Sequence, residues 1–183
     1  LHWIGATGMT GLIISGWAAG TIPNDPAKTP KDVLEFRGKL MHLHESVGLL
    51  MLAFMFPRVA LRLTSRLPAP LPGPAWEHFA AKASHGLLYV GIIFMPISGL
   101  AFGWASGWGV PFFKWHVPGT TKEKADTAEY KAVTNFFYEY HHVVGQMLEY
   151  LLPLHIGATI FHHLYRGHNL LRRMNPFARA VLE

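Results

Sequence analysis

Four histidines lie inside or at the start of long apolar stretches of this 183-residue chain, and their spacing suits metal ligands. His141 and His155 are 14 residues apart. In an α-helix this step returns to within about 40° of the same face and covers about 21 Å. One helix therefore presents two imidazoles to the same side at two depths. If that helix crosses a membrane, each histidine needs a partner and is a candidate functional group.

The elements that position these histidines follow from four stretches almost free of charge. Half of the residues are apolar and only 15% are charged, against about a quarter in a soluble domain. A membrane-spanning helix needs roughly 20 mostly apolar residues. We therefore predict an all-α integral membrane four-helix bundle in one domain, 1–183. Its helices should cover about residues 1–20, 37–63, 77–102 and 135–165.

The rest of the chain carries weaker signals. The stretch 103–134 is rich in glycine and tryptophan and then charged, so we expect an irregular loop with a short surface helix. We find no internal sequence repeat. Gly48 and Gly145 each lie one turn after a histidine, where a small residue leaves room for a flat group between helices.

Alternating helix directions determine which histidines share a depth. His2 opens the first helix at the level of His155, and His44 lies near the start of the second helix at the level of His141. Two imidazole pairs at opposite depths suit two b-type haems in a four-helix bundle. The chain has no cysteine, which excludes thioether-attached haem and iron–sulfur clusters. His85, at the start of the third helix, is the main rival of His2.

Two other interpretations of the histidines are open. They can be polar groups that form hydrogen bonds between helices, or they can bind zinc. Zinc needs three or four ligands at one depth, and two distant pairs do not offer that. Four histidines that pair by both level and face favour the haem interpretation.

Several motifs together resemble bacterial-type cytochrome b561. They are His2-Trp3, His44-x-x-x-Gly48 followed by Arg58, Tyr89-x6-Pro96-x-x-Gly99 and, most specific, His141-x13-His155-x6-His162-His163. The resemblance implies a di-haem b protein of an energy-transducing membrane that exchanges electrons with quinone. It also implies haem ligands at His2, His44, His141 and His155. One member of the family oxidises superoxide at the outer face and reduces ubiquinone at the inner face.

Three further residues are candidates for cofactor or substrate contact. Arg58 lies at the inner depth, where a guanidinium can pair with a haem propionate. Arg37 lies two turns outside His44, beside Lys39, and can hold outer propionates or attract a small anion. His162 lies on the face of His155, roughly 10 Å nearer the inner surface, where a quinone headgroup can bind. The alternatives are snorkelling for Arg58, a solvated cap for Arg37 and lipid-headgroup contact for His162.

We therefore expect transmembrane electron transfer by two haem b groups, coupled to ubiquinone, with superoxide oxidation as the leading enzymatic version. The alternative is a haem-bearing anchor or accessory subunit of a larger respiratory or photosynthetic complex. In that case the aromatic stretch 103–134 would contact protein partners. Membrane lipid is an expected partner in either case. Nucleic acid has no support, because the basic residues lie at membrane edges.

The arginines suggest an orientation in a bacterial or mitochondrial inner membrane. Lysine plus arginine divides evenly between the two sides, but arginine alone does not. Most arginines lie on the side of the termini, which places the termini inside. These are Arg58, Arg62, Arg66, Arg166, Arg172, Arg173 and Arg179.

Overall fold

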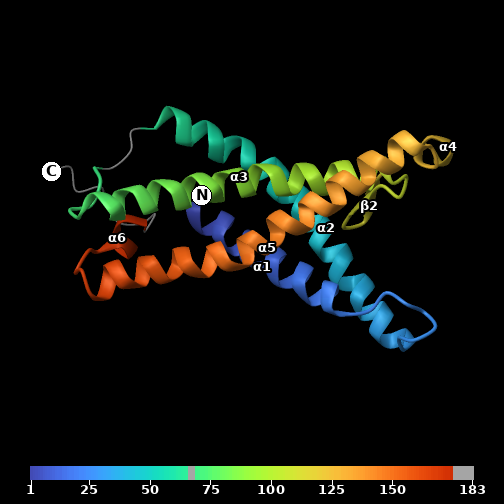
Figure 1. Ribbon diagram of the computed structural model, residues 1–183, viewed down its shortest axis with the longest axis horizontal. Helices are drawn as coiled ribbons and strands as arrows, with labels where there is room; N and C mark the ends of the chain where they lie inside the picture. The colour runs from blue at the N-terminus through green and yellow to red at the C-terminus, as the bar shows by residue number, and fades with distance from the viewer. Residues whose placement is uncertain (66–68, 175–183) are drawn as a thin grey trace.

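The computed structural model describes residues 1–65 and 69–174 (Figure 1). Arg66 and Arg179 of the orientation argument lie outside these ranges. Within them, four long helices follow one another along the chain. They are α1 (His2–Thr21), α2 (Lys31–Thr64), α3 (Ala75–Ala105) and α5 (Ala128–Leu164). The shorter elements are β1 (Val110–Phe112), β2 (Trp115–Val117), α4 (Lys122–Ala125) and α6 (Leu170–Met174).

Helices occupy all four ranges expected from the sequence, but two of them begin earlier. α2 begins at Lys31 rather than near Arg37, directly after Pro30, and carries Asp32 in its first turn. An acidic side chain there interacts favourably with the helix dipole. α5 begins at Ala128 rather than near Asn135, because the Thr127 hydroxyl caps it by accepting a hydrogen bond from the Tyr130 N–H. The acidic first turn of α2 and the polar cap of α5 therefore extend these helices beyond their apolar segments.

The long helices pack as two pairs, α1 with α2 and α3 with α5. α2 also packs against α3, whereas α1 and α5 meet at few positions (Figure 1). Close approach within each pair depends on glycine. A Cβ added to Gly8 of α1 would lie 2.5 Å from the sulfur of Met51, and one added to Gly91 of α3 would lie 2.8 Å from Leu148 Cδ2. The looser contact between α1 and α5 leaves space inside the bundle.

Three helices of the described part, α2, α3 and α5, are long and apolar enough to cross a membrane. Their outward surfaces are apolar as well. The side chains of Phe56, Phe79 and Leu154 are 64%, 75% and 68% exposed. Such apolar surface is typical of contact with lipid. α1 is not one of these three helices. It has 20 residues and no charged side chain, but five of its residues are glycines. That α1 crosses the membrane therefore stays a prediction.

The expected irregular loop proves to be largely a folded cap. β1 and β2 form an antiparallel hairpin that packs on α2. The buried Ser46 hydroxyl accepts a hydrogen bond from the Phe113 N–H at 2.9 Å and donates one to the Pro111 carbonyl at 3.4 Å. His42 Nε2 lies 3.0 Å from the Phe113 carbonyl oxygen. The expected short surface helix is α4. We call this end of the bundle the hairpin side.

The opposite end, the terminal side, is closed by contacts between distant segments. Glu77, buried in the first turn of α3, forms an ion pair with Arg166, which follows α5. The Trp3 indole N–H donates a hydrogen bond to the Met174 carbonyl at 3.1 Å. α6 therefore packs next to the first turn of α1.

Candidate functional site

On the hairpin side, His44 of α2 and His141 of α5 face each other. Their ring centroids are 6.2 Å apart and the ring planes make an angle of 76°. A metal ion bonded to two opposed imidazoles at about 2 Å each holds the centroids about 6 Å apart. The separation therefore fits one axially ligated metal between the rings. Helix topology predicted these two histidines at one depth, and the structure brings them together.

The His44 ring is held by α1. Its Nδ1 lies 3.0 Å from the Leu12 carbonyl oxygen and 3.2 Å from the Ser15 hydroxyl. Ser15 donates its own proton to the Leu12 carbonyl, so both neighbours are acceptors for the histidine. Nδ1 therefore carries the proton, which leaves Nε2 free to bind a metal. Gly16 lets the ring approach α1, because a Cβ there would lie 3.0 Å from His44 Cε1.

The His141 ring is held by α3 in the same manner. Its Nδ1 lies 2.9 Å from the Ser98 hydroxyl, and Ser98 donates its proton to the Met95 carbonyl at 3.0 Å. Nδ1 is again the donor, and Nε2 is again free. A Cβ on Gly99 would lie 3.3 Å from His141 Cε1. Both rings are thus oriented in the way that protein ligands of metals usually are.

No role beside the ligands was expected from the sequence for Ser15, Gly16, Ser98 or Gly99, although Gly99 belongs to one of the family motifs. Room for a flat group was expected beside Gly48 and Gly145. No atom lies within 4 Å of a Cβ added to Gly48, and only the Met95 methyl lies near Gly145, at 3.6 Å. The two expected glycines therefore border open or loosely filled space. The sequence contains one signal for these residues, a serine directly followed by a glycine in each of two predicted helices.

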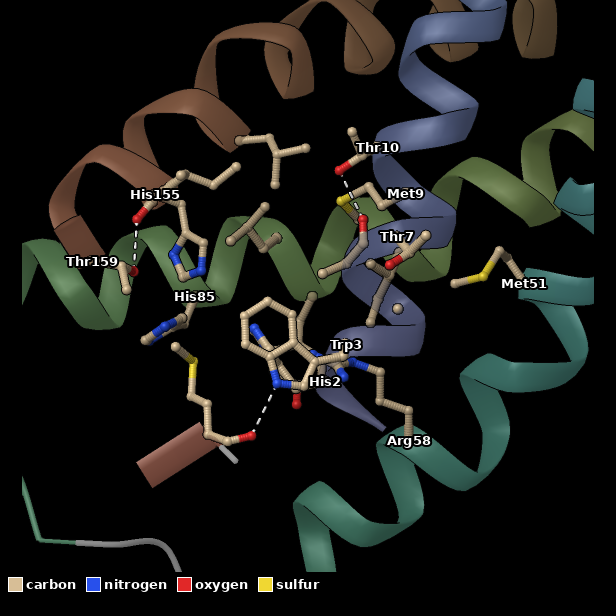
Figure 2. Close-up of a pocket in the computed structure, with 18 of the residues that line it drawn as sticks. His2, Trp3, Thr7, Met9, Thr10, Met51, Arg58, His85, His155 and Thr159 are labelled. Carbon is tan, nitrogen blue, oxygen red and sulfur yellow. Dashed lines mark hydrogen bonds between the residues drawn. The ribbon is translucent and has the colours of Figure 1, made fainter. Parts of the chain in front are cut away.

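On the terminal side, a cavity of about 780 Å³ opens among α1, α2, α3 and α5, within the usual size of cofactor pockets. His2, His85 and His155 all line it. Figure 2 shows His2 on α1 across the cavity from His155 on α5, with His85 of α3 beside His155. The His85 and His155 centroids are 5.2 Å apart, less than the separation on the hairpin side. The cavity itself lies between His155 and His2.

Arg58 lines the same cavity and has an unsatisfied group. Its Nε is buried without a hydrogen-bond partner, and its guanidinium carbon lies 5.6 Å from the centre of the Tyr89 ring. A buried donor without an acceptor costs free energy. A carboxylate bound in the cavity would supply the acceptor, so the position fits a haem propionate.

Arg37 shows the same feature on the hairpin side, since its Nε is buried without a partner. It lies two turns before His44 in α2, as the sequence spacing predicted. Lys39 does not accompany it, because Lys39 lines a separate open hollow of about 500 Å³ with Glu35, Gly38 and His42. Arg37 and Lys39 are two positions apart on α2 and therefore do not share a face of the helix.

His162 is not among the residues that line the cavity. Its ring stacks on His168, with centroids 5.5 Å apart and planes at 16°, and the two Nδ1 atoms are 3.3 Å apart. Gly167, with a positive φ of 68°, turns the chain after α5 so that His168 folds back. The helical spacing from His155 could not reveal this pairing.

The comparisons with known proteins place the chain in a family. It belongs to the prokaryotic cytochrome b561 family, whose model matches residues 1–176. It is therefore a membrane electron-transfer protein of a family that binds b-type haem. Among the described residues, no group of three or more His, Cys, Asp or Glu side chains is arranged to hold a metal ion. A metal bound by two histidines here would need the further ligands that a macrocycle supplies.

Three relatives illustrate the similarity. Cytochrome b561 homolog 1 of Escherichia coli K12 is 30% identical over 73% of this chain and 73% of its own length. Cytochrome b561 homolog 2 of the same organism is 30% identical over 74% of this chain and 70% of its own. The probable superoxide oxidase CybB of Yersinia pestis is 27% identical over 98% of this chain and 94% of its own.

The cavity geometry predicts which histidine pairs with His155. Because His2 lies across the cavity and His85 lies beside His155, His2→Ala should remove any haem bound on the terminal side, and His85→Ala should keep it. Haem-to-protein ratios from the pyridine haemochrome of the two purified variants measure this. Loss of haem in His85→Ala alone would instead make His85 the ligand.

Proposed function

We propose that this protein transfers electrons across the membrane through two b haems and exchanges them with ubiquinone. The proposal depends on the facing pair His44 and His141. Their ring centroids are 6.2 Å apart, and the Nε2 atom of each ring is free. The cavity lined by His2 and His155 supports a second haem. Each haem, when bound, accepts and releases single electrons at its iron. The four histidines would hold the two irons, and Arg58 and Arg37 would bind propionates.

The spacing of two histidines along α5 sets the distance between the two proposed haem sites. His141 and His155 are separated by about 21 Å along the helix axis. Two bound macrocycles would occupy part of this distance, so the gap between their edges would be well below this value. Both ligands belong to one continuous helix, which keeps the gap constant. Direct transfer between the two groups therefore needs no third cofactor.

The proposed bundle includes α1 as a fourth membrane helix. α1 packs along α2, with Gly8 against Met51 and Gly16 against the His44 ring. If α2 crosses the membrane, these contacts hold α1 at the same depth. The arginines on the terminal side support termini on the inside of a bacterial or mitochondrial inner membrane.

The first test of this function concerns haem stoichiometry. We expect about two haems per chain in the native protein and about one in His44→Ala, because the hairpin-side pair loses a ligand. His42→Ala is the matched control, since His42 lies on the same helix but contacts the hairpin. Pyridine haemochrome analysis gives the ratios. One haem in the native protein, or two in His44→Ala, would contradict the proposal.

Ubiquinone is proposed to react on the terminal side, near His162. The His162–His168 contact requires one ring to donate and the other to accept, so the pair can pass a proton toward a reduced quinone. Complete reduction takes two electrons and two protons. The terminal-side haem, when bound, would supply the electrons one at a time.

His162→Ala and His168→Ala should each slow electron exchange with ubiquinone by about 10- to 100-fold while both haems remain, because positioned acid–base groups contribute on this scale or more. Stopped-flow reduction and reoxidation with a soluble ubiquinone analogue measures the rate. His78→Ala is the control, since His78 contacts the Gly73 carbonyl elsewhere on the terminal side. An unchanged rate in both variants would return His162 to a lipid-interface role.

Superoxide is the proposed electron donor on the hairpin side. Two observations favour it: Arg37 places a cation two turns outside His44 on α2, and a relative aligned over nearly the whole chain is named a probable superoxide oxidase. Two superoxide ions would release two molecules of dioxygen and the two electrons that one ubiquinone needs. A cation near the haem would attract the anion.

Arg37→Gln should lower the rate of haem reduction by superoxide, and rising salt should lower the native rate, because exposed charges are screened over about 8–10 Å at physiological ionic strength. The matched control is Arg62→Gln, which removes an arginine of the terminal side. Pulse-generated superoxide and optical detection of the reduced haem provide the rates. Rates independent of both salt and Arg37 would leave a protein or quinol donor.

Superoxide rates that depend on neither salt nor Arg37 would favour the alternative function, an anchor or accessory subunit of a larger complex. The hairpin uses its backbone to dock on α2, but the side chains of Trp108 and Trp115 are 78% and 70% exposed. These two rings fit either a lipid interface or a protein partner. Purification in a gentle detergent distinguishes the cases, because stable partner chains accompany only the anchor subunit.

A further inference from the structure

Two segments of the chain share a short sequence repeat that places the same residues against the two hairpin-side histidines. Residues 14–20 read Ile-Ser-Gly-Trp-Ala-Ala-Gly, and residues 97–103 read Ile-Ser-Gly-Leu-Ala-Phe-Gly. The first lies in α1, which packs on the helix of His44, and the second lies in α3, which packs on the helix of His141. This repeat is too short to be evident without the contacts.

Equivalent atoms make equivalent contacts in the two segments. Each serine hydroxyl donates to the carbonyl three residues earlier and lies next to the Nδ1 of one histidine. Each following glycine leaves room for the Cε1 of that same ring. The helix pairs α1–α2 and α3–α5 therefore present their histidines in the same way from opposite sides.

We propose that Ser15 and Ser98 are positioning residues that fix the tautomer and raise the basicity of His44 and His141. The inference rests on the proposed haem between those rings. A hydrogen bond accepted from Nδ1–H increases the electron donation of the imidazole through Nε2. Stronger donation stabilises oxidised iron, so the two serines lower the reduction potential of the hairpin-side haem.

Loss of the serine hydroxyl should not affect the two histidines equally. His44 Nδ1 also lies 3.0 Å from the Leu12 carbonyl, so it keeps an acceptor if Ser15 loses its hydroxyl. His141 also interacts with the Met95 carbonyl, but among the described residues it is the Ser98 hydroxyl, 2.9 Å from Nδ1, that meets hydrogen-bond geometry. Ser98 is also fully buried, which excludes water as a simple substitute. Loss of Ser98 should therefore matter more than loss of Ser15.

The terminal-side histidines lack this support. In the described ranges, the rings of His2, His85 and His155 form no hydrogen bond, and they border an open cavity instead. The effect of the serines should therefore be confined to one haem. The other haem serves as an internal reference in the same molecule.

The test is a potentiometric titration of purified holoprotein, followed optically and by electron paramagnetic resonance, for Ser98→Ala, Ser15→Ala and Ser98→Thr. The control is Ser106→Ala, because Ser106 bonds the Gly103 carbonyl in the same helix away from the rings. We expect a positive shift in the potential of one haem, larger for Ser98→Ala than for Ser15→Ala. Threonine should restore the native value, since its hydroxyl can make the same bonds in a helix.

Selective loss of the hairpin-side haem in Ser98→Ala, with retention in Ser98→Thr, would also support the proposal, since loss of such a partner costs about 10- to 100-fold in metal affinity. An unchanged potential and spectrum in Ser98→Ala, a negative shift, or equal loss of haem in the Thr variant would overturn it. If the native protein binds no haem on the hairpin side, the proposed function fails instead. The native haem ratio therefore separates the two failures.

Discussion

Two imidazoles can bind the same metal ion from opposite sides only while their ring centroids stay about 6 Å apart. Much of this structure maintains that separation. His44 and His141 belong to helices of different pairs, so the gap depends on how the pairs sit against each other. α1 and α3 hold the rings from outside, and the contact of α2 with α3 joins the pairs. The loose contact of α1 with α5 leaves the interior free for a flat group.

The hairpin secures the same end of the bundle. Ser46 lies two residues after His44 and forms hydrogen bonds with Pro111 of β1 and with Phe113 in the turn that follows. Gly109, at φ +72°, allows the chain to enter the hairpin where a Cβ would meet the Val117 carbonyl at 2.3 Å. A segment with short strands thus restrains the outer part of α2 close to a candidate ligand.

The sequence was informative wherever one-dimensional spacing determines geometry. Charge-poor stretches predicted the helices, and helix direction predicted that His44 would meet His141. Features that depend on contact between helices were missed, because the acceptor for each Nδ1 belongs to another helix. The early start of α5 follows from a single cap at Thr127. His162 was placed by its own helix, whereas the turn at Gly167 determines its partner.

α6 gives the two ends of the bundle different access routes. This five-residue helix contributes Leu171 and Met174 to the cavity wall and joins α1 through the Trp3–Met174 hydrogen bond. A hydrogen bond of this kind contributes about 1 kcal/mol, so this contact adds little to the packing that holds the long helices together. On the hairpin side, the histidines lie between packed helices. If the protein binds the two proposed haems, the terminal-side haem would enter a cavity bordered by this short helix, whereas the hairpin-side haem would have to be in place as the helix pairs close.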